Sequence, residues 1–205
     1  RNLAFLHKVS SSIEEIPFEN LKTETTSHLF ERKNRELRSI RKFIGKVRGK
    51  NDFELLYMDC FDSFYKEASH ALAHLLKAEA DLANTDCGMC HGAYHYHNVF
   101  ILPDYSVATV NFESLCYQPY LLDLYLFLRK TLEKNHYDYA FFETGISGYS
   151  IYRHLTEKDF LFLYLLFLYP EKFWKISNQY YNHRKSWIPP RTLEKLQKVL
   201  AQNEE

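Results

Sequence analysis

The sequence predicts an α+β fold that is mostly helical and contains one short β-hairpin. Apolar side chains recur every three or four residues over much of the 205-residue chain, which is the spacing of one helix face. Only residues 98–102 and 107–112 have strand-like composition, and the PDYS segment at 103–106 between them is typical of a turn. The length lies near the upper end of the common domain size, so the chain can bury a full core.

The N-terminal half is predicted to be helical. The apolar run at 1–9 indicates a first helix, and Leu37, Ile40 and Ile44 make residues 32–50 amphipathic. Asp52 is predicted to cap a long helix that follows. The apolar face of that helix is expected to consist of Phe53, Leu56, Tyr57, Cys60, Phe64, Ala68, Ala71 and Leu75.

The C-terminal half is predicted to form five further helices. Thr156 and Asp159 have the spacing of an N-terminal capping pair, and Pro189 and Pro190 are expected to introduce the last helix. In the first of the five, Leu121, Tyr125, Leu128 and Leu132 are expected to line one face. The predicted ranges are 121–134, 137–152, 157–169, 171–182 and 191–202.

Composition limits the classes of partner. Lys and Arg together number 26, as do Asp and Glu, so net charge provides no general attraction to nucleic acid or anionic membranes. The most apolar run, 160–169, has ten residues, whereas a membrane helix needs about 20, and no membrane partner is predicted. The four cysteines, Cys60, Cys87, Cys90 and Cys116, are typical of a reduced chain without a disulfide framework.

One segment, Arg32 to Lys50, is strongly basic. It contains nine Lys or Arg residues, and Glu36 is its single acid. Such a segment is either an ordinary solvated helix face or a binding surface for an acidic partner. Because no interleaved aromatic residues or DNA-binding motif accompany it, nucleic acid is not a predicted partner. The basic residues are Arg32, Lys33, Arg35, Arg38, Arg41, Lys42, Lys46, Arg48 and Lys50.

The motif that concerns chemistry is CHGAYHYHNVFI at 90–101, followed by ATVNFE at 108–113. Kinase-type sites place an Asp beside the substrate hydroxyl, then an Asn that binds metal, then a second Asp on the next strand that binds Mg²⁺. The spacing is kept here, with Ala93, Asn98 and Asn111 at these three positions. Both carboxylates are therefore replaced by neutral groups.

This arrangement resembles the aminoglycoside phosphotransferase and choline kinase branch of the kinase-like fold, and within it the CotS-type spore-coat proteins of endospore-forming bacteria. The resemblance also covers LLDLYLFLRKTLEK at 121–134 and FLYPEKFWKISNQYYN at 167–182. It implies that residues 1–205 form the helical C-terminal lobe and that the nucleotide-binding N-terminal lobe is absent from this chain. It further implies a protein made in the mother-cell cytoplasm that assembles with other proteins in the spore coat.

The resemblance implies that the site is vestigial, with no intact catalytic residue. In that family the histidine at the position of His91 is held by loop backbone, and an Asp at the position of Asp123 braces the catalytic loop. Asp123 is equally explained as a first-turn acid favourable to the helix dipole. The expected function is therefore non-catalytic, without cofactor, with ATP and Mg²⁺ bound only if the full-length protein retains activity. The vestigial positions are His91, Ala93, Asn98, Asn111, Glu113 and Asp123.

Three alternatives remain open at the motif. In a working small-molecule phosphotransferase, Glu113 would bind the metal and His95 or His97 would act as the base. In a second alternative, the region is an ordinary strand-turn-strand unrelated to kinases. In the third, Cys87-Gly-Met-Cys90-His91 matches the c-type haem attachment pattern, or forms a zinc site with the nearby histidines. Two cysteines that enter a buried loop explain the same residues more simply.

Overall fold

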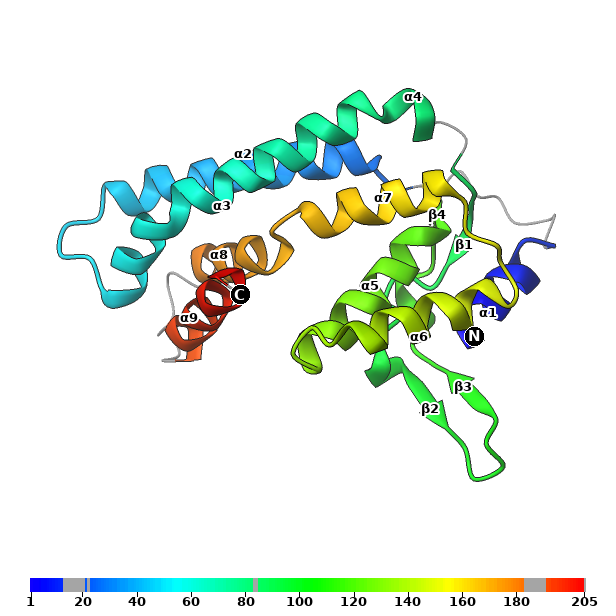
Figure 1. The fold of residues 1–205 in the computed structure, drawn as a ribbon. Coiled ribbons are helices and arrows are strands. Elements are labelled where there is room, and N and C mark those ends of the chain that lie inside the picture. The colour runs from blue at the N-terminus through cyan, green and yellow to red at the C-terminus, as the bar shows by residue number, and fades with distance from the viewer. Residues whose placement is uncertain (13–20, 22, 83–84, 183–190, 205) are drawn as a thin grey trace. The chain divides into compact units, whose positions relative to one another are not determined.

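The computed structural model describes residues 1–12, 21, 23–82, 85–182 and 191–204. These residues form two compact units. The first comprises Arg1–Glu24 and Glu79–Phe167, and the second comprises Thr25–Ala78 and Leu168–Glu205. Their elements are labelled in Figure 1. The prolines predicted to introduce the last helix, Pro189 and Pro190, lie outside the described residues.

The first unit contains helices and two small antiparallel sheets. Strand β2 (Val99–Ile101) pairs with β3 (Val107–Thr109), which confirms the predicted hairpin. Strand β1 (Cys87–Cys90) pairs with β4 (Cys116–Pro119). The helices are α1 (Asn2–Ser10), α4 (Glu79–Leu82), α5 (Tyr120–Lys134), α6 (Tyr139–Ser150) and α7 (Glu157–Leu168), with 3₁₀ turns η2 (Tyr96–Asn98) and η3 (Phe112–Ser114).

The pairing of β1 with β4 was not predicted, because the sequence indicated only the hairpin. Each of the two strands has only four residues, and glycine at position 88 is a poor strand former. The structure explains this glycine. A Cβ at Gly88 would lie 1.8 Å from the hydroxyl oxygen of Tyr120, so a tertiary contact requires the small residue.

Helix α5 is central to the first unit and packs against α6, β1 and β4. Its buried leucines are Leu121, Leu124, Leu128 and Leu132. The predicted face is therefore confirmed except at Tyr125, which is half-buried. Because β1 and β4 lie against this helix, the loop between β1 and η2 is held near the first turn of α5. This loop, residues 91–95, is called here the motif loop.

Helix α7 begins as the sequence predicts. The backbone N–H of Thr156 donates to Asp159 Oδ2 at 2.8 Å, and Thr156 Oγ1 accepts from the backbone N–H of Asp159 at 3.4 Å. These reciprocal bonds satisfy groups that a helix start leaves unpaired. The helix has 12 residues, and no helix in the described ranges has both the length and the apolar character needed to cross a membrane.

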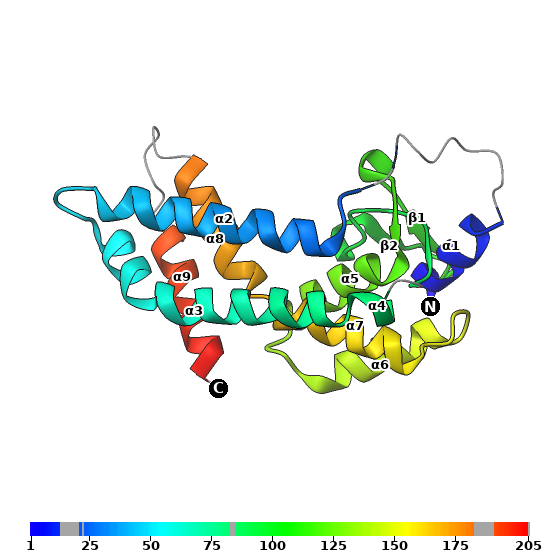
Figure 2. The ribbon, with the colours of Figure 1, turned by 90° about the horizontal axis from the view of Figure 1, so that it is seen from above.

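The second unit consists of helices α2 (Thr26–Gly45), α3 (Asp52–Lys77), α8 (Glu171–Asn182) and α9 (Arg191–Glu204). Helices α2 and α3 lie side by side (Figures 1 and 2). Aromatic rings fill the space between helices: Phe173 stacks on Tyr57, with centroids 5.3 Å apart, and on Phe64, at 4.4 Å. Phe173 on α8 is therefore part of the core of this unit.

Two details of the long helix differ from prediction. The N-cap is Asn51, not Asp52: Asn51 Oδ1 accepts from the backbone N–H of Glu54 at 3.0 Å, and the Glu54 carboxylate accepts from the Asn51 N–H at 2.9 Å. Leu56 is half-buried, whereas Phe61, which was not predicted, is buried. The first difference arises because Asn51 and Glu54 form a capping box one residue before the predicted cap. Phe61 is buried because it follows the buried Tyr57 by four residues and so lies on the same helix face.

The basic segment also differs from prediction. Its helix ends at Gly45, so residues 46–50 are not part of the helix. Lys33 does not face solvent: it is buried, forms an ion pair with Glu171, and lies over the Trp174 ring at 4.4 Å. Periodicity alone does not show this, because the partners come from α8, more than 130 residues later in the chain.

Candidate functional site

The loop after β1 is held by the carboxylate of Asp123, in the first turn of α5. Asp123 is buried, and its carboxylate oxygens accept from the backbone N–H groups of His91 at 2.7 Å and Gly92 at 2.9 Å. A third partner, His7 Nε2, lies 3.3 Å from Asp123 Oδ2. Because hydrogen bonds to a charged acceptor are stronger than neutral ones, this side chain fixes the loop backbone.

His91 links the loop to the strand that precedes Asn111. Its ring is fully buried, and the ring Nε2 lies 2.9 Å from the carbonyl oxygen of Val110. The backbone N–H of Ala93 donates to His91 Nδ1 at 3.2 Å. Since Nδ1 accepts, the proton must be on Nε2, and His91 is a neutral imidazole with both nitrogens satisfied. The ring therefore positions backbone and is not available as a base.

Gly92 allows the loop to turn tightly. Its φ is +74°, and a Cβ at this position would lie 2.0 Å from the carbonyl oxygen of Ser114. Both the dihedral angle and the close approach exclude a side chain. The tight turn brings Ala93 next to the segment that carries Asn98 and Asn111.

Ala93, Asn98 and Asn111 are joined by side-chain amides. Asn98 Nδ2 donates to the Ala93 carbonyl oxygen at 2.9 Å, and Asn111 Nδ2 donates to Asn98 Oδ1 at 2.9 Å. Asn111 has left-handed backbone, with φ 64° and ψ 57°, a conformation that asparagine tolerates better than most residues. The structure thus brings five of the six predicted positions, 91, 93, 98, 111 and 123, into one network, and leaves out position 113.

The residues of this network do not fit a kinase-type Mg²⁺ site. Mg²⁺ in such sites is bound through one or two carboxylates. Here the corresponding side chains are amides, and Asn98 Oδ1 already accepts from Asn111. Ala93 offers only a methyl group where a base would be needed. Both amide Nδ2 groups donate within the network, and the Asp123 carboxylate accepts from the loop backbone, so no carboxylate replaces those that a kinase-type Mg²⁺ site requires.

Glu113, His95 and His97 are not part of the amide network of Asn98 and Asn111. Glu113 is exposed in η3, and no hydrogen bond among the described residues joins it to Asn98 or Asn111. The rings of His95 and His97 lie 5.5 Å apart. The Nδ1 atom of His95 is buried without a hydrogen-bond partner, and burial, with smaller contributions from His97 and Lys130, lowers the pKa of this imidazole.

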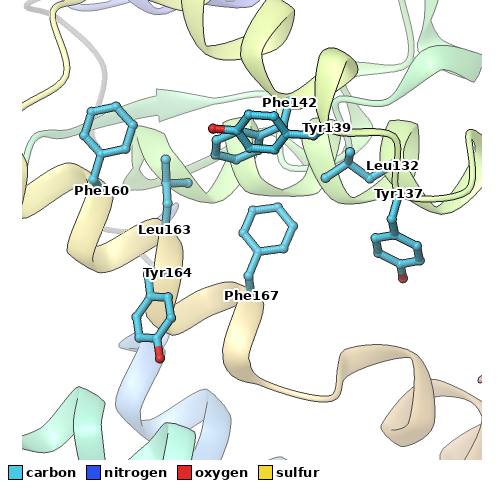
Figure 3. A pocket seen from close by; sticks show the side chains of 8 residues that line it. All are labelled: Leu132, Tyr137, Tyr139, Phe142, Phe160, Leu163, Tyr164 and Phe167. Carbon is cyan, nitrogen blue, oxygen red and sulfur yellow. The ribbon is translucent and has the colours of Figure 1, made fainter. Parts of the chain in front are cut away.

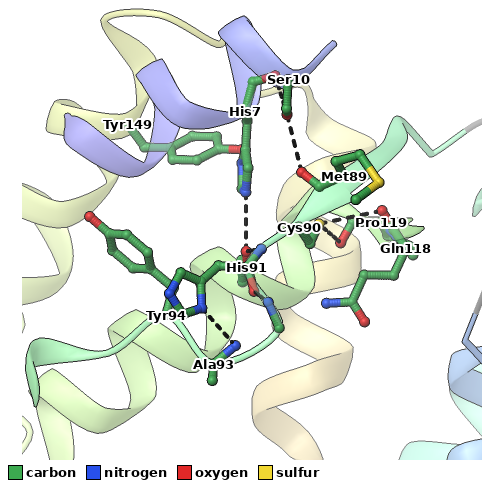
Figure 4. A network of polar contacts seen from close by, with 12 residues as sticks. His7, Ser10, Met89, Cys90, His91, Ala93, Tyr94, Gln118, Pro119 and Tyr149 are labelled. Carbon is green, nitrogen blue, oxygen red and sulfur yellow. Dashed lines mark hydrogen bonds and ion pairs between the residues drawn. The ribbon is translucent and has the colours of Figure 1, made fainter. Parts of the chain in front are cut away.

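Sequence reasoning missed the role of His7. This fully buried residue on α1 lies beside Tyr149 (Figure 4), with Nδ1 2.9 Å from the Tyr149 hydroxyl. Its Nε2 lies near Asp123. Burial lowers the His7 pKa, although Asp123 opposes this shift. A neutral His7 therefore accepts from Tyr149 and donates to Asp123. The available signal was a single histidine inside an apolar helix.

One group of potential metal ligands lies close together in the described part of the chain: His7, Cys90 and Asp123. It includes neither Cys87 nor His95 nor His97, which a zinc site drawn from the CxxCH pattern would require. Burial raises the pKa of Cys90, whose thiol donates to the Gln118 carbonyl oxygen at 3.5 Å. Metals bind the thiolate, whereas the Cys90 thiol is protonated and already donates a hydrogen bond. The cluster of His7, Cys90 and Asp123 is therefore better explained as buried hydrogen-bonded side chains than as a metal site.

An apolar pocket of about 370 Å³ lies elsewhere in the first unit, between α5, α6 and α7 (Figure 3). Six of its eight lining side chains are aromatic, and the rings of Tyr139 and Phe142 stack with centroids 5.8 Å apart. None of the motif residues lines it. The lining residues are Leu132, Tyr137, Tyr139, Phe142, Phe160, Leu163, Tyr164 and Phe167.

Comparison with known proteins relates the chain to one fold. No protein-family model matches it, and no curated protein sequence matches it. A solved structure, an aminoglycoside phosphotransferase from Alicyclobacillus acidocaldarius subsp. acidocaldarius DSM 446, is similar with a TM-score of 0.79 and 21% sequence identity. The similarity covers 98% of this chain and 62% of that protein.

The fold class is therefore confirmed. The chain has the fold of the helical lobe of aminoglycoside phosphotransferase-like proteins, which belong to the kinase-like fold. It spans 62% of the length of the solved phosphotransferase. At 21% identity this likeness concerns architecture, so function must be argued from the side chains at the site.

Proposed function

We propose that this chain is the helical lobe of a kinase-fold protein that does not transfer phosphoryl groups and serves in assembly of the bacterial spore coat. The observation that carries the first part is the amide network, in which Asn111 donates to Asn98 and Asn98 donates to the backbone of Ala93. In a phosphotransfer site the side chains at these three positions would face a nucleophile and a metal. Here the two asparagine side chains bond to each other and to the backbone carbonyl of Ala93, whose own side chain is a methyl group.

The chemical cost of these substitutions is large. A positioned general base contributes roughly 10²- to 10⁴-fold to rate, and the methyl group of Ala93 cannot accept a proton. A neutral amide oxygen at Asn111 cannot neutralise the charge of Mg²⁺ as a carboxylate does. Asp123 and His91 meanwhile keep the loop in place, so the architecture is retained without the chemistry.

The role in the spore coat rests on the sequence resemblance to CotS-type proteins. In this proposal the protein is made in the mother-cell cytoplasm and binds other coat proteins. Exposed apolar side chains on the β2–β3 hairpin support a protein-contact role, since Ile101 is 76% and Tyr105 88% exposed. Residues 1–205 then form the helical lobe, and a nucleotide-binding lobe lies in a part of the protein outside them. The coverage of 62% of the solved phosphotransferase supports this division.

One observation favours a second candidate, a small-molecule phosphotransferase with displaced catalytic groups. His95 has a buried, unpartnered Nδ1 and a pKa below its ordinary value, so it is neutral near pH 7 and able to accept a proton. Glu113 would then supply the carboxylate for metal two residues beyond Asn111. In this candidate, turnover depends on both side chains.

The two candidates are separated by assays of the full-length protein. We expect no phosphotransfer from ATP above background in the presence of Mg²⁺. Wild-type turnover that is lost in Glu113→Gln or His95→Gln, and kept in the exposed control Glu143→Gln, would establish the second candidate instead. The double substitution Ala93→Asp, Asn111→Asp should raise Mg²⁺-nucleotide binding above wild type if the missing carboxylates are the cause.

The cellular part of the proposal has its own test. A tagged full-length protein followed through sporulation should appear in the purified coat fraction. Its recovery only from the soluble mother-cell fraction would contradict a coat role, whatever the result of the enzyme assays.

A further inference from the structure

The charges of this chain are unevenly distributed. The whole chain has 26 basic and 26 acidic residues, but residues 32–50 contain nine basic residues and one acid. The remaining residues therefore contain 17 basic and 25 acidic side chains. A net charge of zero conceals one strongly cationic segment, most of which lies on α2.

Some of these cations stabilise the fold, whereas others face solvent. Lys33 is buried against Glu171, and Arg32 pairs with Glu36. Four exposed residues on α2 and its C-cap follow each other at intervals of three or four, which places them on one helix face. At 1.5 Å per residue this face extends over about 16 Å. The four are Arg35, Arg38, Lys42 and Lys46, called here the cationic stripe.

A groove adjoins the cationic stripe. It has a volume of about 460 Å³ and lies between α2 and α3. Its α2 side carries cations and a glycine that adds no side chain, and its α3 side carries apolar and aromatic groups. The lining residues are Arg38, Arg41, Lys42 and Gly45 on α2, with Met58, Phe61 and Tyr65 on α3.

Two guanidinium groups at the groove are already held in position. The Arg41 guanidinium lies 4.7 Å over the Phe61 ring and pairs with Asp62 at 3.1 Å. Arg38 Nη1 donates to the Tyr65 hydroxyl at 3.2 Å. Because these side chains are ordered before binding, they lose less conformational entropy when they bind a carboxylate.

We propose that this groove and the cationic stripe bind an acidic polypeptide segment. An apolar side chain of the partner enters the groove over Met58 and Tyr65, and its carboxylates pair with Arg38, Lys42 and their neighbours on the stripe. Charge complementarity supports this occupant, because the cations line one side and the apolar surface the other. The inference is independent of whether the lobe is catalytic.

A polyphosphate or nucleic acid fits this surface less well. Asp62 on α3 is exposed and pairs with Arg41 at the groove, and a continuous phosphate backbone would meet its carboxylate with like charge. A peptide can confine its carboxylates to the α2 side. The apolar groove also matches a hydrophobic side chain and not a sugar-phosphate chain.

The test uses the full-length protein and a fluorescein-labelled peptide with three Glu residues on either side of one Phe. We expect its affinity to fall by about tenfold in Arg38→Gln, Lys42→Gln, through loss of two charge interactions. The matched control Lys195→Gln, Lys198→Gln removes two exposed charges from α9 and should change affinity less than about twofold.

A second variant tests the groove without a change of charge. A Cβ at Gly45 meets no atom within 4 Å, so Gly45→Leu should fold normally and place a side chain in the groove. It should weaken the Phe-containing peptide but not the same peptide with Gly in place of Phe. Any one of four results would overturn the proposal. The first two are equal weakening of peptide binding by both double variants and no effect of Gly45→Leu. The other two are tighter binding of an oligodeoxythymidylate than of the peptide, and self-association that depends on Arg38.

Discussion

The carboxylate of Asp123 accepts hydrogen bonds from two backbone N–H groups of the loop that follows β1. It accepts from the backbone N–H groups of His91 and Gly92 and lies within hydrogen-bond distance of His7. Asp123→Ala leaves these buried donors without a partner, so the free energy of unfolding should fall by about 3–5 kcal/mol. Urea unfolding followed by far-UV circular dichroism measures the loss.

Asp138→Ala, at an exposed aspartate, is the control for Asp123→Ala. Asp138 caps α6 by accepting from the backbone N–H of Ala140 at 2.9 Å. Asp138→Ala should cost only about 1 kcal/mol, the usual value for an N-cap. Similar losses for the two variants would show that the Asp123 network contributes no more than an ordinary cap.

The buried His7 predicts a pH dependence of stability. Burial lowers its pKa in the folded state below the ordinary value near 6.5. As the pH falls below about 6.5, the unfolded chain binds a proton that the folded chain resists, so the free energy of unfolding decreases. His7→Gln removes this titration, and its stability should fall less steeply than wild type between about pH 7 and pH 5.5. Urea midpoints at both pH values measure the two slopes.

The matched variant for His7 is His28→Gln, since His28 is exposed on α2. This variant should retain the wild-type slope. If His7→Gln and wild type have the same slope, the protonation of His7 is not coupled to folding.

The site could be predicted in part because its positions are close in sequence. The intervals between Ala93, Asn98 and Asn111 are those of a loop and a hairpin, and the structure joins these residues by hydrogen bonds. The contact between His7 and Tyr149 spans 142 residues. Neither residue has a local pattern that indicates the other, so only the folded chain reveals the pair.

The start of α3 provides a test of a single element. Asn51 forms a reciprocal capping box with Glu54, whereas Asp52 is the first helical residue. Asn51→Ala should lower the free energy of unfolding by about 1 kcal/mol. Asp52→Ala loses only a favourable charge near the helix dipole, worth about 0.3–1 kcal/mol. If thermal or urea unfolding shows that Asp52→Ala lowers the free energy of unfolding more than Asn51→Ala does, then Asp52 is the N-cap, as predicted from the sequence.

Helices were easier to predict here than strands. The ranges for α5, α7 and α8 follow the periodicity of apolar residues within a residue or two, because one buried face determines each helix. The pairing of β1 with β4 depends on four-residue strands separated by a hairpin, and Gly88 is explained only by its contact with Tyr120. Local composition does not contain that information.

The division of the chain into two compact units has a consequence for unfolding. Each unit has buried apolar residues of its own, such as Leu124 and Leu128 in the first and Tyr57 and Phe173 in the second. Trp174, one of the two tryptophans in the sequence, belongs to the second unit. In a Trp187→Phe background, tryptophan fluorescence therefore reports on the second unit, whereas circular dichroism reports on helices of both.

The variant Gly92→Ala tests whether the two units unfold independently, because fluorescence follows one unit and circular dichroism follows both. The added Cβ would meet the Ser114 carbonyl oxygen at 2.0 Å and require a left-handed φ of +74°, so the first unit should lose about 2 kcal/mol or more. Because each unit has its own core, the urea midpoint by circular dichroism should fall while the midpoint by tryptophan fluorescence stays at the wild-type value. Gly45→Ala, in open space near the end of α2, should instead leave the first unit unchanged and stabilise the second by up to about 1 kcal/mol. Coincident shifts of both probes in Gly92→Ala would mean that the two units unfold as one cooperative structure.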